Sequence, residues 1–469
     1  MVTPNSPDIC PAPQQRLSLS LCLGFSVGTV GVSIMLNTVT SFYPAFMSTV
    51  LGQSPEIAGY LLMIAKLADA VIDVAVGSLS DRARTRWGRR KPFLLAGGML
   101  SAMSFLMLFA PPPLSQGALM AWMIAGLLIY STAYSLFNVP YMALPAELTD
   151  GYHERTRLIS FRTVFVSIGQ LLATAGTAAL VQKGGAGRDG YATMGLVMAL
   201  VIAGAMTATA LSVPVGRNST APDTADTAAR PRHLPGPAQF RAIGRNRPFM
   251  LLLGAKVFQF LAFASVASTT LLFMLNVVGI GYDGQIVMAL TQNLVAALAM
   301  PLWVWCGRRI GKRRTYLIGV VLFCLASLSW LLADQTITTA GIAARAALAG
   351  LGSGALLLMS VSMLGDTQAF DRALTGEARE GLLSSAVAVV EKVSFALGVA
   401  VLGVFLRALD YMPTTGGAII AQPPRAILAL KLGFAVIPAL LFLCNGLFLW
   451  FYDLDEERLA AAVAAPVPG

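Results

Sequence analysis

Three ionisable side chains interrupt the apolar stretch at residues 56–80. Lys66, Asp69 and Asp73 stand at positions i, i+3 and i+7, a spacing that places all of them on one face of a helix. A charge near the centre of a bilayer costs about 2.5 to 3.5 kcal/mol on insertion scales, so a membrane helix with three charges must turn them toward a polar interior. This face is therefore the first candidate for a functional site.

The chain as a whole is too apolar for a soluble protein of its size. Its 469 residues are 56% hydrophobic and only 12% charged, and the mean hydropathy is +0.71, which predicts a membrane protein with many spans. The net charge of +10 does not indicate nucleic-acid binding, because the basic residues stand in short segments between apolar runs. The five cysteines show no CxxC spacing and are expected to pack between helices.

About twelve apolar runs are long enough to cross a bilayer, which takes about 20 residues each. The runs form two sets, at 19–49, 56–80, 92–112, 117–144, 158–184 and 192–215, and at 247–279, 284–307, 315–334, 338–365, 381–409 and 427–452. The segment between the sets is rich in Thr, Ala and Pro, which predicts a flexible linker. The expected organisation is an N-terminal tail at 1–18, a helical bundle at 19–215, a linker at 216–246, a second bundle at 247–452 and a C-terminal tail at 453–469.

Positive charge is concentrated in alternate connections between these runs. The connection after the second run holds Arg82 to Lys91 and the one after the eighth holds Arg308 to Arg314, whereas the connections at 112–117, 280–283 and 335–338 carry almost no positive charge. By the positive-inside rule, both termini and the linker are expected in the cytoplasm. The expected location is the cell (inner) membrane.

The two basic connections also indicate an internal repeat. Gly77 to Lys91 and Gly307 to Arg314 each follow the second helix of their set, which resembles the parallel repeats of major facilitator transporters, with a substrate site expected near the midplane. The predicted fold is an all-α polytopic membrane protein with twelve transmembrane helices in two six-helix pseudo-repeats. The resemblance implies a cytoplasmic gate, in which a glycine permits close helix approach, formed by Gly77, Asp81, Arg82, Arg89 and Arg90.

A more specific resemblance covers both sets. The segment from Lys66 to Asp73, Ser80-Asp81-Arg82 and Trp87-Gly88-Arg89-Arg90-Lys91-Pro92 resemble the glycoside-pentoside-hexuronide:cation symporter family, which includes melibiose permease. Further segments that match are Tyr134 to Tyr141, Glu154 to Arg162, Asn246-Arg247-Pro248-Phe249, Gly376 to Gly381 and Glu391-Lys392. The resemblance implies cation-coupled symport of a small organic solute, a sugar or glycoside, by alternating access.

In that family two carboxylates of the second helix hold the coupling cation, and a lysine of the eleventh helix lies close to them. Carried over, Asp69 and Asp73 are the cation ligands, Lys392 is their counter-charge and Lys66 is a further basic neighbour. Helix geometry supports the pairing, because Asp69 and Lys392 both lie about 11 residues, or roughly 16 Å, from the cytoplasmic ends expected for their helices. Two carboxylates and two ammonium groups would be neutral together, which lowers the cost of burying them.

The identity of the coupling cation is where the sequence departs from the family. Ile72 stands where melibiose permease has an asparagine, so an oxygen ligand favoured by a hard cation is missing. Ser135 still offers a hydroxyl. A carboxylate pair can accept a proton without a coordination cage, so we expect H+ in preference to Na+, with Na+ at Asp69 and Asp73 as the alternative.

The substrate positions depart from the family as well. Family sugar carriers use acids in helices I and IV, where this chain has Ser33 and Asn138. Asn138 can still form paired hydrogen bonds to a polyol, and Tyr134, Tyr141 and Arg162 are further candidates. A neutral glycoside, an anionic glycoside drawn by Arg162 and a non-sugar metabolite all remain open.

Other polar residues of the apolar runs either line the cavity or form hydrogen bonds between helices: Lys256, Asn276, Gln292, Asn293 and Arg345. No phosphate-binding loop, nucleophile or metal constellation predicts an enzyme or a cofactor. The expected partners are a small-molecule solute, a cation and the bilayer, without nucleic acid, and we expect a monomer. Two other hypotheses remain, namely an uncoupled facilitator or exporter and a non-transporting sensor on the same fold.

Overall fold

The computed structural model describes residues 17–83, 85–149, 152–213, 244, 246–376 and 379–464, which are almost wholly helical. The first set of helices is α1 (Leu19–Thr49), α2 (Pro55–Arg82), α3 (Lys91–Phe109), α4 (Gln116–Leu148), α5 (Tyr152–Leu171), α6 (Thr177–Lys183) and α7 (Arg188–Ser212). The second set is α9 (Arg247–Phe273), α10 (Gly281–Leu298), α11 (Met300–Ile310), α12 (Lys312–Ser329), α13 (Thr339–Thr375), α14 (Glu380–Ala408), α15 (Pro424–Lys431), α16 (Ile437–Trp450) and α17 (Glu456–Ala464). Short π-helical or 3-10 segments are η1 (Leu172–Gly176), η2 (Met274–Val278), η3 (Trp330–Leu332) and η4 (Leu432–Val436).

In the described part of the chain, ten helical spans are long and apolar enough to cross a membrane, and α10 with α11 makes an eleventh if that bent pair is one span. The bend between these two helices is 46°, and Pro301 follows it directly in the first turn of α11. The helix α2 has 28 residues, within the range of lengths of these spans. It falls outside this set and carries Lys66, Asp69 and Asp73 among its residues.

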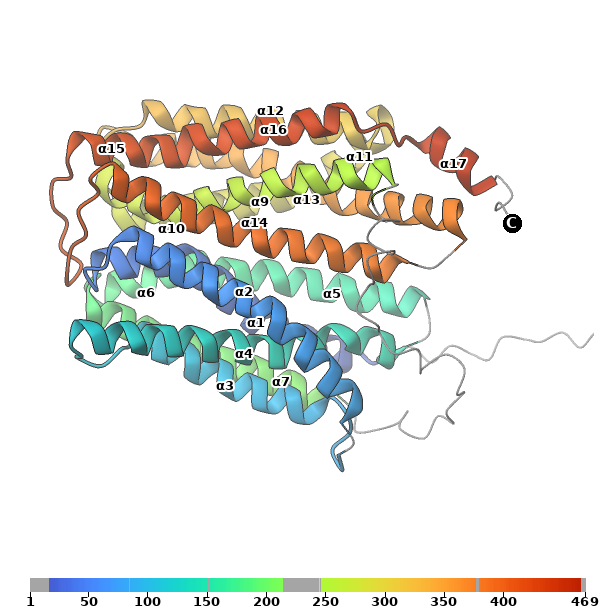
Figure 1. Cartoon of the computed structure of the whole chain (residues 1–469), viewed down its shortest axis with the longest axis horizontal. Helices are drawn as coiled ribbons and strands as arrows, with labels where there is room; N and C mark the ends of the chain where they lie inside the picture. The colour runs from blue at the N-terminus through green and yellow to red at the C-terminus, as the bar shows by residue number, and fades with distance from the viewer. Residues whose placement is uncertain are drawn as a thin grey trace, which may run out of the picture.

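The helices lie side by side in two groups, which follow the two sets along the chain (Figure 1). The N-terminal group runs from α1 to α7 and the C-terminal group from α9 to α17. One end of the molecule carries the end of α7, the start of α9 and the helix α17, and we call it the linker end. The opposite end carries the connection at 409–423 between α14 and α15, and we call it the closed end (Figure 1).

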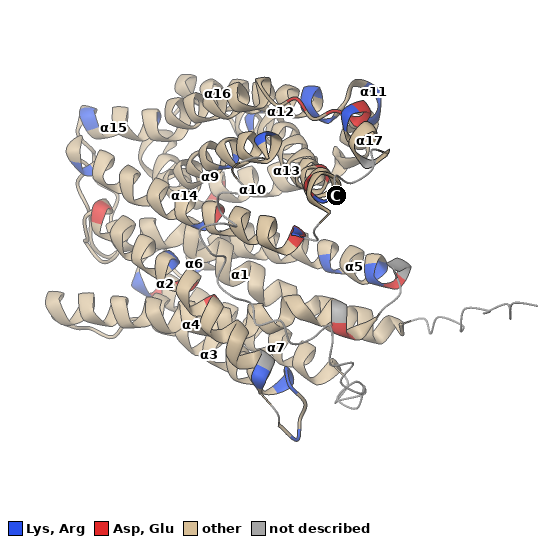
Figure 2. Cartoon of the chain, turned by 45° about the vertical axis from the view of Figure 1, so that its right-hand side comes forward, with Lys and Arg blue, Asp and Glu red and all other residues tan. Residues whose placement is uncertain are grey.

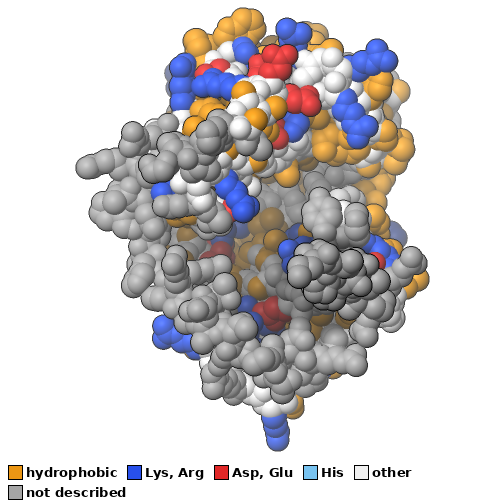
Figure 3. Space-filling model, turned by 90° about the vertical axis from the view of Figure 1, so that its right-hand side faces the viewer, with side chains coloured by type: hydrophobic (Ala, Val, Ile, Leu, Met, Phe, Trp, Pro, Cys, Tyr) orange, Lys and Arg blue, Asp and Glu red, His pale blue; other side chains and the backbone are white. Residues whose placement is uncertain are grey.

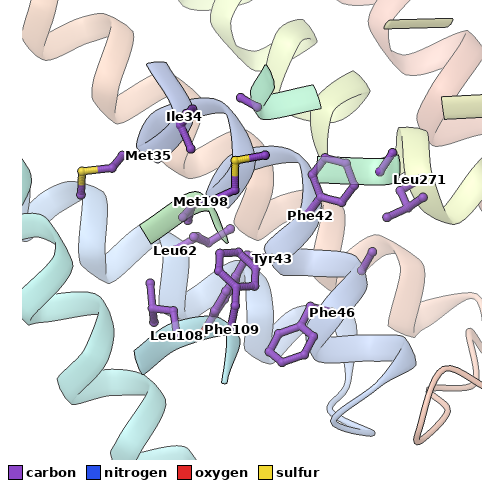
Figure 4. Close-up of a cluster of buried hydrophobic side chains, with 14 of the residues drawn as sticks. Ile34, Met35, Phe42, Tyr43, Phe46, Leu62, Leu108, Phe109, Met198 and Leu271 are labelled. Carbon is purple, nitrogen blue, oxygen red and sulfur yellow. The ribbon is translucent and has the colours of Figure 1, made fainter. Parts of the chain in front are cut away.

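The helix α1 lies at the centre of the largest buried cluster (Figure 4). Its aromatic residues Phe42, Tyr43 and Phe46 are fully buried and belong to one cluster with Leu62 of α2 and Leu271 of α9. Side chains packed this closely gain van der Waals contacts with the neighbouring helices. Apolar packing therefore joins the two groups through α1.

In the C-terminal group, the residues that pack against α1 lie in the half nearer the closed end. The cluster around α1 takes in Leu271 to Met288 and Val399 to Phe434, whereas a second cluster at the linker end, with Leu252, Trp303 and Met363 among its members, consists of C-terminal residues alone. Apolar packing between the groups therefore closes one end and leaves the other end without a shared core.

Two glycines allow α2 and α14 to touch at the closed end. A Cβ atom on Gly59 would lie 2.9 Å from the Val399 carbonyl oxygen, and one on Gly403 would lie 2.5 Å from the Pro55 carbonyl oxygen. Contacts this short exclude any larger residue unless the helices separate. The Glu56–Arg407 ion pair joins the same two helices.

The connection at 409–423 closes this end further with backbone hydrogen bonds to the end of α1. Thr414 N donates to Ser48 O at 2.7 Å, and Gly416 N donates to Val50 O at 3.0 Å. Leu51 and Thr415 form an antiparallel bridge. Burial raises the pKa of Tyr411 in this connection to about 12, so its phenol remains protonated at physiological pH.

Residues 456–464, within the segment expected as a C-terminal tail, form the helix α17. This segment is rich in alanine with two glutamates in its first turn, a composition that favours helix. Leu459 packs against the cluster at the linker end, and Arg458 lies 5.8 Å from the centre of the Phe370 ring. Tertiary packing thus stabilises a helix too short to be stable alone.

Charged residues gather mainly at the two ends of the helices (Figure 2). Figure 3 looks at the linker end, where Lys and Arg side chains stand on the upper and lower rims and hydrophobic side chains are visible between them.

The connection between α11 and α12 is shorter than expected, because helix continues to Ile310 and resumes at Lys312. Gly311 makes this sharp turn with a φ of +87°, in the region that favours glycine.

Candidate functional site

The helix face predicted from Lys66, Asp69 and Asp73 meets α14 of the other group. Asp69 is buried, with 3% of its surface exposed, and its Oδ2 accepts a hydrogen bond of 2.7 Å from Lys392 Nζ. Lys392 also forms an ion pair with Asp73 Oδ2. One ammonium group therefore bridges two carboxylates of α2 and ties the N-terminal group to the C-terminal group.

The two carboxylates differ in how fully they are satisfied. Ser135 of α4 donates to Asp69 Oδ1 at 2.9 Å, so both oxygens of Asp69 are engaged. Asp73 Oδ1 is buried and has no hydrogen-bond partner among the described residues. Since an unpaired buried oxygen costs about 1 to 3 kcal/mol or more, Asp73 has the oxygen that gains most from a proton or another cation.

Lys66 lies close enough to Asp69, Asp73 and Lys392 for electrostatic interaction. It forms no ion pair within 4 Å in the described part of the chain. With Lys392 it balances the two carboxylates in formal charge, as expected. A buried ion pair is often worse for stability than apolar packing, so stability alone does not explain these charges. This cluster is therefore the strongest candidate for a functional site.

A second ion pair stands beside the first, and the sequence reasoning missed it. Lys256 Nζ of α9 donates to Glu391 Oε1 at 2.7 Å, and Glu391 is the residue before Lys392 on α14. The Lys256 side chain is 7% exposed and that of Glu391 is 29% exposed. The sequence does show Lys256 and Glu391 as charged residues inside apolar runs. Only the packing of α9 on α14 shows that the two side chains pair with each other.

Three of the five residues predicted to bind substrate, Tyr134, Asn138 and Arg162, are half-buried. Tyr134 is within electrostatic range of Asp69, Asp73 and Arg162. Asn138 is half-buried, and its side chain forms no hydrogen bond within the described ranges. Arg162 has a buried Nε without a hydrogen-bond partner there.

The other two residues have structural contacts. Tyr141 is fully buried, its hydroxyl donates to Phe25 O at 2.9 Å, and its ring stacks on Phe25 at a centroid distance of 4.7 Å. Arg162 lies 5.9 Å from the centre of that ring. Ser33 is 5% exposed and lies where α1 and α5 touch, since a Cβ on Gly169 would come within 2.7 Å of it. Tyr141 is therefore placed to position Arg162, and Ser33 to pack helices.

The predicted gate residues lie at the linker end. Arg89 donates to Glu147 of α4 at 2.6 Å, and Arg90 donates to Glu147 at 3.0 Å and to Ser80 at 2.8 Å. These contacts join α2, α3 and α4, all within the N-terminal group. Arg82 is exposed at the end of α2, and the side chain of Asp81 lies outside the described residues.

The expected close approach at Gly77 is absent from this conformation. A Cβ atom there would lie 3.6 Å from Val139 Cγ1, which is an ordinary van der Waals distance. A closer approach within this group occurs at Gly97, where a Cβ would come within 2.6 Å of the Phe137 backbone nitrogen. Sequence spacing alone could not distinguish the two glycines.

No set of three or more His, Cys, Asp or Glu side chains in the described residues is arranged to hold a metal ion. A cavity of about 180 Å³ lies at the closed end, lined by residues that include Gln182, Asn276 and Thr414. None of the charged cluster lines it. The charged cluster is therefore separate from this cavity.

The profile of the family described as MFS/sugar transport protein matches residues 24–456. The chain belongs to this family. Among similar proteins is the isoprimeverose transporter of Lactiplantibacillus pentosus, 24% identical over 92% of this chain and 88% of the relative. The glucuronide carrier protein homolog of Escherichia coli (strain K12) is 27% identical over 96% of this chain and 95% of the relative. An uncharacterized symporter of Synechocystis sp. is 26% identical over 94% and 95%.

The MFS/sugar transport protein family and these relatives are transporters. The sequence-based resemblance to glycoside-pentoside-hexuronide symporters is thereby confirmed. A bacterial homolog of the human lysosomal transporter Spinster, solved in an inward-facing and unoccupied conformation, superposes with a TM-score of 0.67 at 14% identity, over 96% of this chain and 98% of that one. This similarity supports the major facilitator fold.

Proposed function

We propose that the protein is a cation-coupled symporter of a glycoside or a related polyhydroxylated solute. The observation that supports this most is the ion pair of Lys392 with Asp69 and Asp73, because it joins the two helix groups through charges inside apolar helices. A cation that binds the carboxylates competes with Lys392 for them. Cation binding would therefore change the contact between the groups, which alternating access requires.

The coupling cation in this proposal is H+ in preference to Na+. Asp69 already accepts from Ser135 and Lys392, and Asp73 offers one unpaired buried oxygen. A proton needs a single oxygen, whereas a hard metal cation favours several oxygen ligands. Ile72 contributes no side-chain oxygen between the two aspartates. Protonation of Asp73 would weaken its attraction to Lys392.

The proposed topology has twelve spans, with α2 as the charged span and α10 with α11 as one bent span. The linker end carries the basic residues between α2 and α3 and between α11 and α12. In this proposal, by the positive-inside rule, the linker end and both termini are cytoplasmic. The proposed location is the inner membrane and the proposed state is a monomer. The shared core at the closed end corresponds to a conformation open toward the cytoplasm.

The names of two relatives suggest the solutes to test. Purified protein in proteoliposomes would be offered isoprimeverose or a glucuronide, with a pH gradient or a sodium gradient of equal size. We expect accumulation driven by the pH gradient, and loss of accumulation but not of solute exchange in Asp73→Asn. Equilibration of the solute without accumulation under either gradient would support an uncoupled facilitator, and no flux of either solute would contradict glycoside symport.

A further inference from the structure

The ion pair between Lys256 and Glu391 leaves polar groups of both partners unused. An ammonium group has three donors, and among the described residues Lys256 makes one hydrogen bond, to Glu391 Oε1 at 2.7 Å. Its ammonium also lies 5.7 Å from the centre of the Phe260 ring. Glu391 Oε2 accepts no hydrogen bond within the residues that the structure describes. The pair therefore offers free donors and a free acceptor close together.

The position of Glu391 indicates which space these groups face. Glu391 precedes Lys392 on α14, so its backbone lies at the depth of the Asp69 and Asp73 cluster. Its side chain is 29% exposed. A charge exposed to lipid at this depth would cost about 2.5 to 3.5 kcal/mol even on insertion scales, so the exposed part of Glu391 faces the aqueous space between the two helix groups.

A purely structural role does not account for this pair. Removing both charges in favour of apolar side chains is often neutral or stabilising, and a partly satisfied buried network is costly. The missing partner must be able to accept from an ammonium and donate to a carboxylate. A hydroxyl group does both at once, whereas an anionic group would be repelled by Glu391.

We propose that Lys256 and Glu391 form a substrate subsite in the C-terminal group, which binds hydroxyl groups on an uncharged part of the solute. Arg162 and Asn138 face the same solute from the N-terminal group. The solute would then contact both groups and stabilise the conformations in which they approach each other. This inference rests on the proposed function, because it concerns the solute of the same transporter.

The test is binding of isoprimeverose, and separately of a methyl glucuronide, to the purified full chain by calorimetry. A hydrogen bond to a charged group contributes about 1.5 to 3 kcal/mol, so we expect Glu391→Gln to weaken binding by about 10- to 100-fold. Asp366→Asn is the matched control. It makes the same change in the Lys312–Asp366 pair, which has the same 2.7 Å distance but lies at the linker end.

A second variant keeps the test valid if Glu391→Gln folds poorly. The double change Lys256→Met with Glu391→Leu leaves no unpaired charge, and we expect normal thermal stability with equally weakened binding. Wild-type affinity in a folded variant would overturn the subsite and leave the proposed function intact. Equal weakening by Asp366→Asn would also overturn it. If the wild-type protein binds neither probe, the proposed solute class fails together with the subsite.

Discussion

Lys392 on α14 donates a hydrogen bond of 2.7 Å to Asp69 on α2, although the two residues are 323 positions apart in the chain. This contact is the polar counterpart of the apolar packing between α2 and α14 at Gly59 and Gly403. It differs from that packing in one respect, because an ion pair can be broken by a competing cation. The contact between the groups is thereby sensitive to the occupancy of the carboxylates.

Removal of the bridging ammonium should destabilise the protein strongly. Lys392→Met leaves the buried carboxylate of Asp69 without its counter-charge, and breaking a buried pair in this way costs about 3 to 5 kcal/mol. We expect a large fall in the thermal unfolding temperature, which the added change Asp69→Asn partly restores. The control is Lys312→Met, whose partner Asp366 lies in a more exposed pair worth about 0 to 1 kcal/mol. An equal fall in the unfolding temperature of both variants would contradict a stabilising role for the ion pair of Lys392.

Substitution of the hydroxyl beside Asp69 should lower stability mildly. Ser135→Ala removes the hydrogen bond of 2.9 Å to Asp69 Oδ1 and leaves Lys392 in place. A buried oxygen that loses its donor costs about 1 to 3 kcal/mol, so we expect a lower thermal unfolding temperature, with a smaller loss than in Lys392→Met. An unchanged unfolding temperature in Ser135→Ala would mean that this hydrogen bond does not stabilise the folded protein.

A disulfide across the bridge at the closed end should arrest transport. Leu51 and Thr415 face each other as an antiparallel bridge, and directly opposed residues have Cβ atoms about 4.5 to 5.5 Å apart. We expect Leu51→Cys with Thr415→Cys, in a background without the native cysteines, to lose uptake on oxidation and regain it on reduction. Thr415→Cys alone is the control. Full uptake by the cross-linked protein would mean that this end need not open.

The sequence predicts the first charge cluster well because depth and helical face can both be counted along the chain. Asp69 and Lys392 lie at similar distances from the ends of their helices, and the spacing of Lys66, Asp69 and Asp73 fixes their common face. Helix rotation cannot be counted in this way. Whether Glu391 faces α9, or Tyr141 packs into the core, depends on which ridges of neighbouring helices interlock.

The same limit applies to the glycines and to the C-terminal segment. Gly77 and Gly97 are equally plausible points of close approach in the sequence, and only the packing of α3 on α4 selects Gly97. The helix α17 is too short for its composition to predict it with certainty, and contacts of Leu459 with the rest of the molecule decide its formation. Charge patterns are thus read from the sequence more directly than packing contacts.

An added methyl group between α2 and α14 should open the closed end. Gly403→Ala places a Cβ 2.5 Å from the Pro55 carbonyl oxygen, and backbone at this distance cannot move without separating the helices. We expect a cysteine introduced at Ser48, which is buried in this conformation, to react faster with a maleimide in the Gly403→Ala variant.

The matched control for this change is Gly365→Ala on α13, where a Cβ would meet no atom within 4 Å. Alanine in an open helical position stabilises the helix by about 0.5 to 1 kcal/mol relative to glycine, so this control should raise the unfolding temperature without changing the labelling rate. Unchanged labelling in Gly403→Ala would show that the contact with Pro55 is not what holds this end closed. Faster labelling in both variants would point to a general loosening of the helices instead of a local separation of α2 from α14.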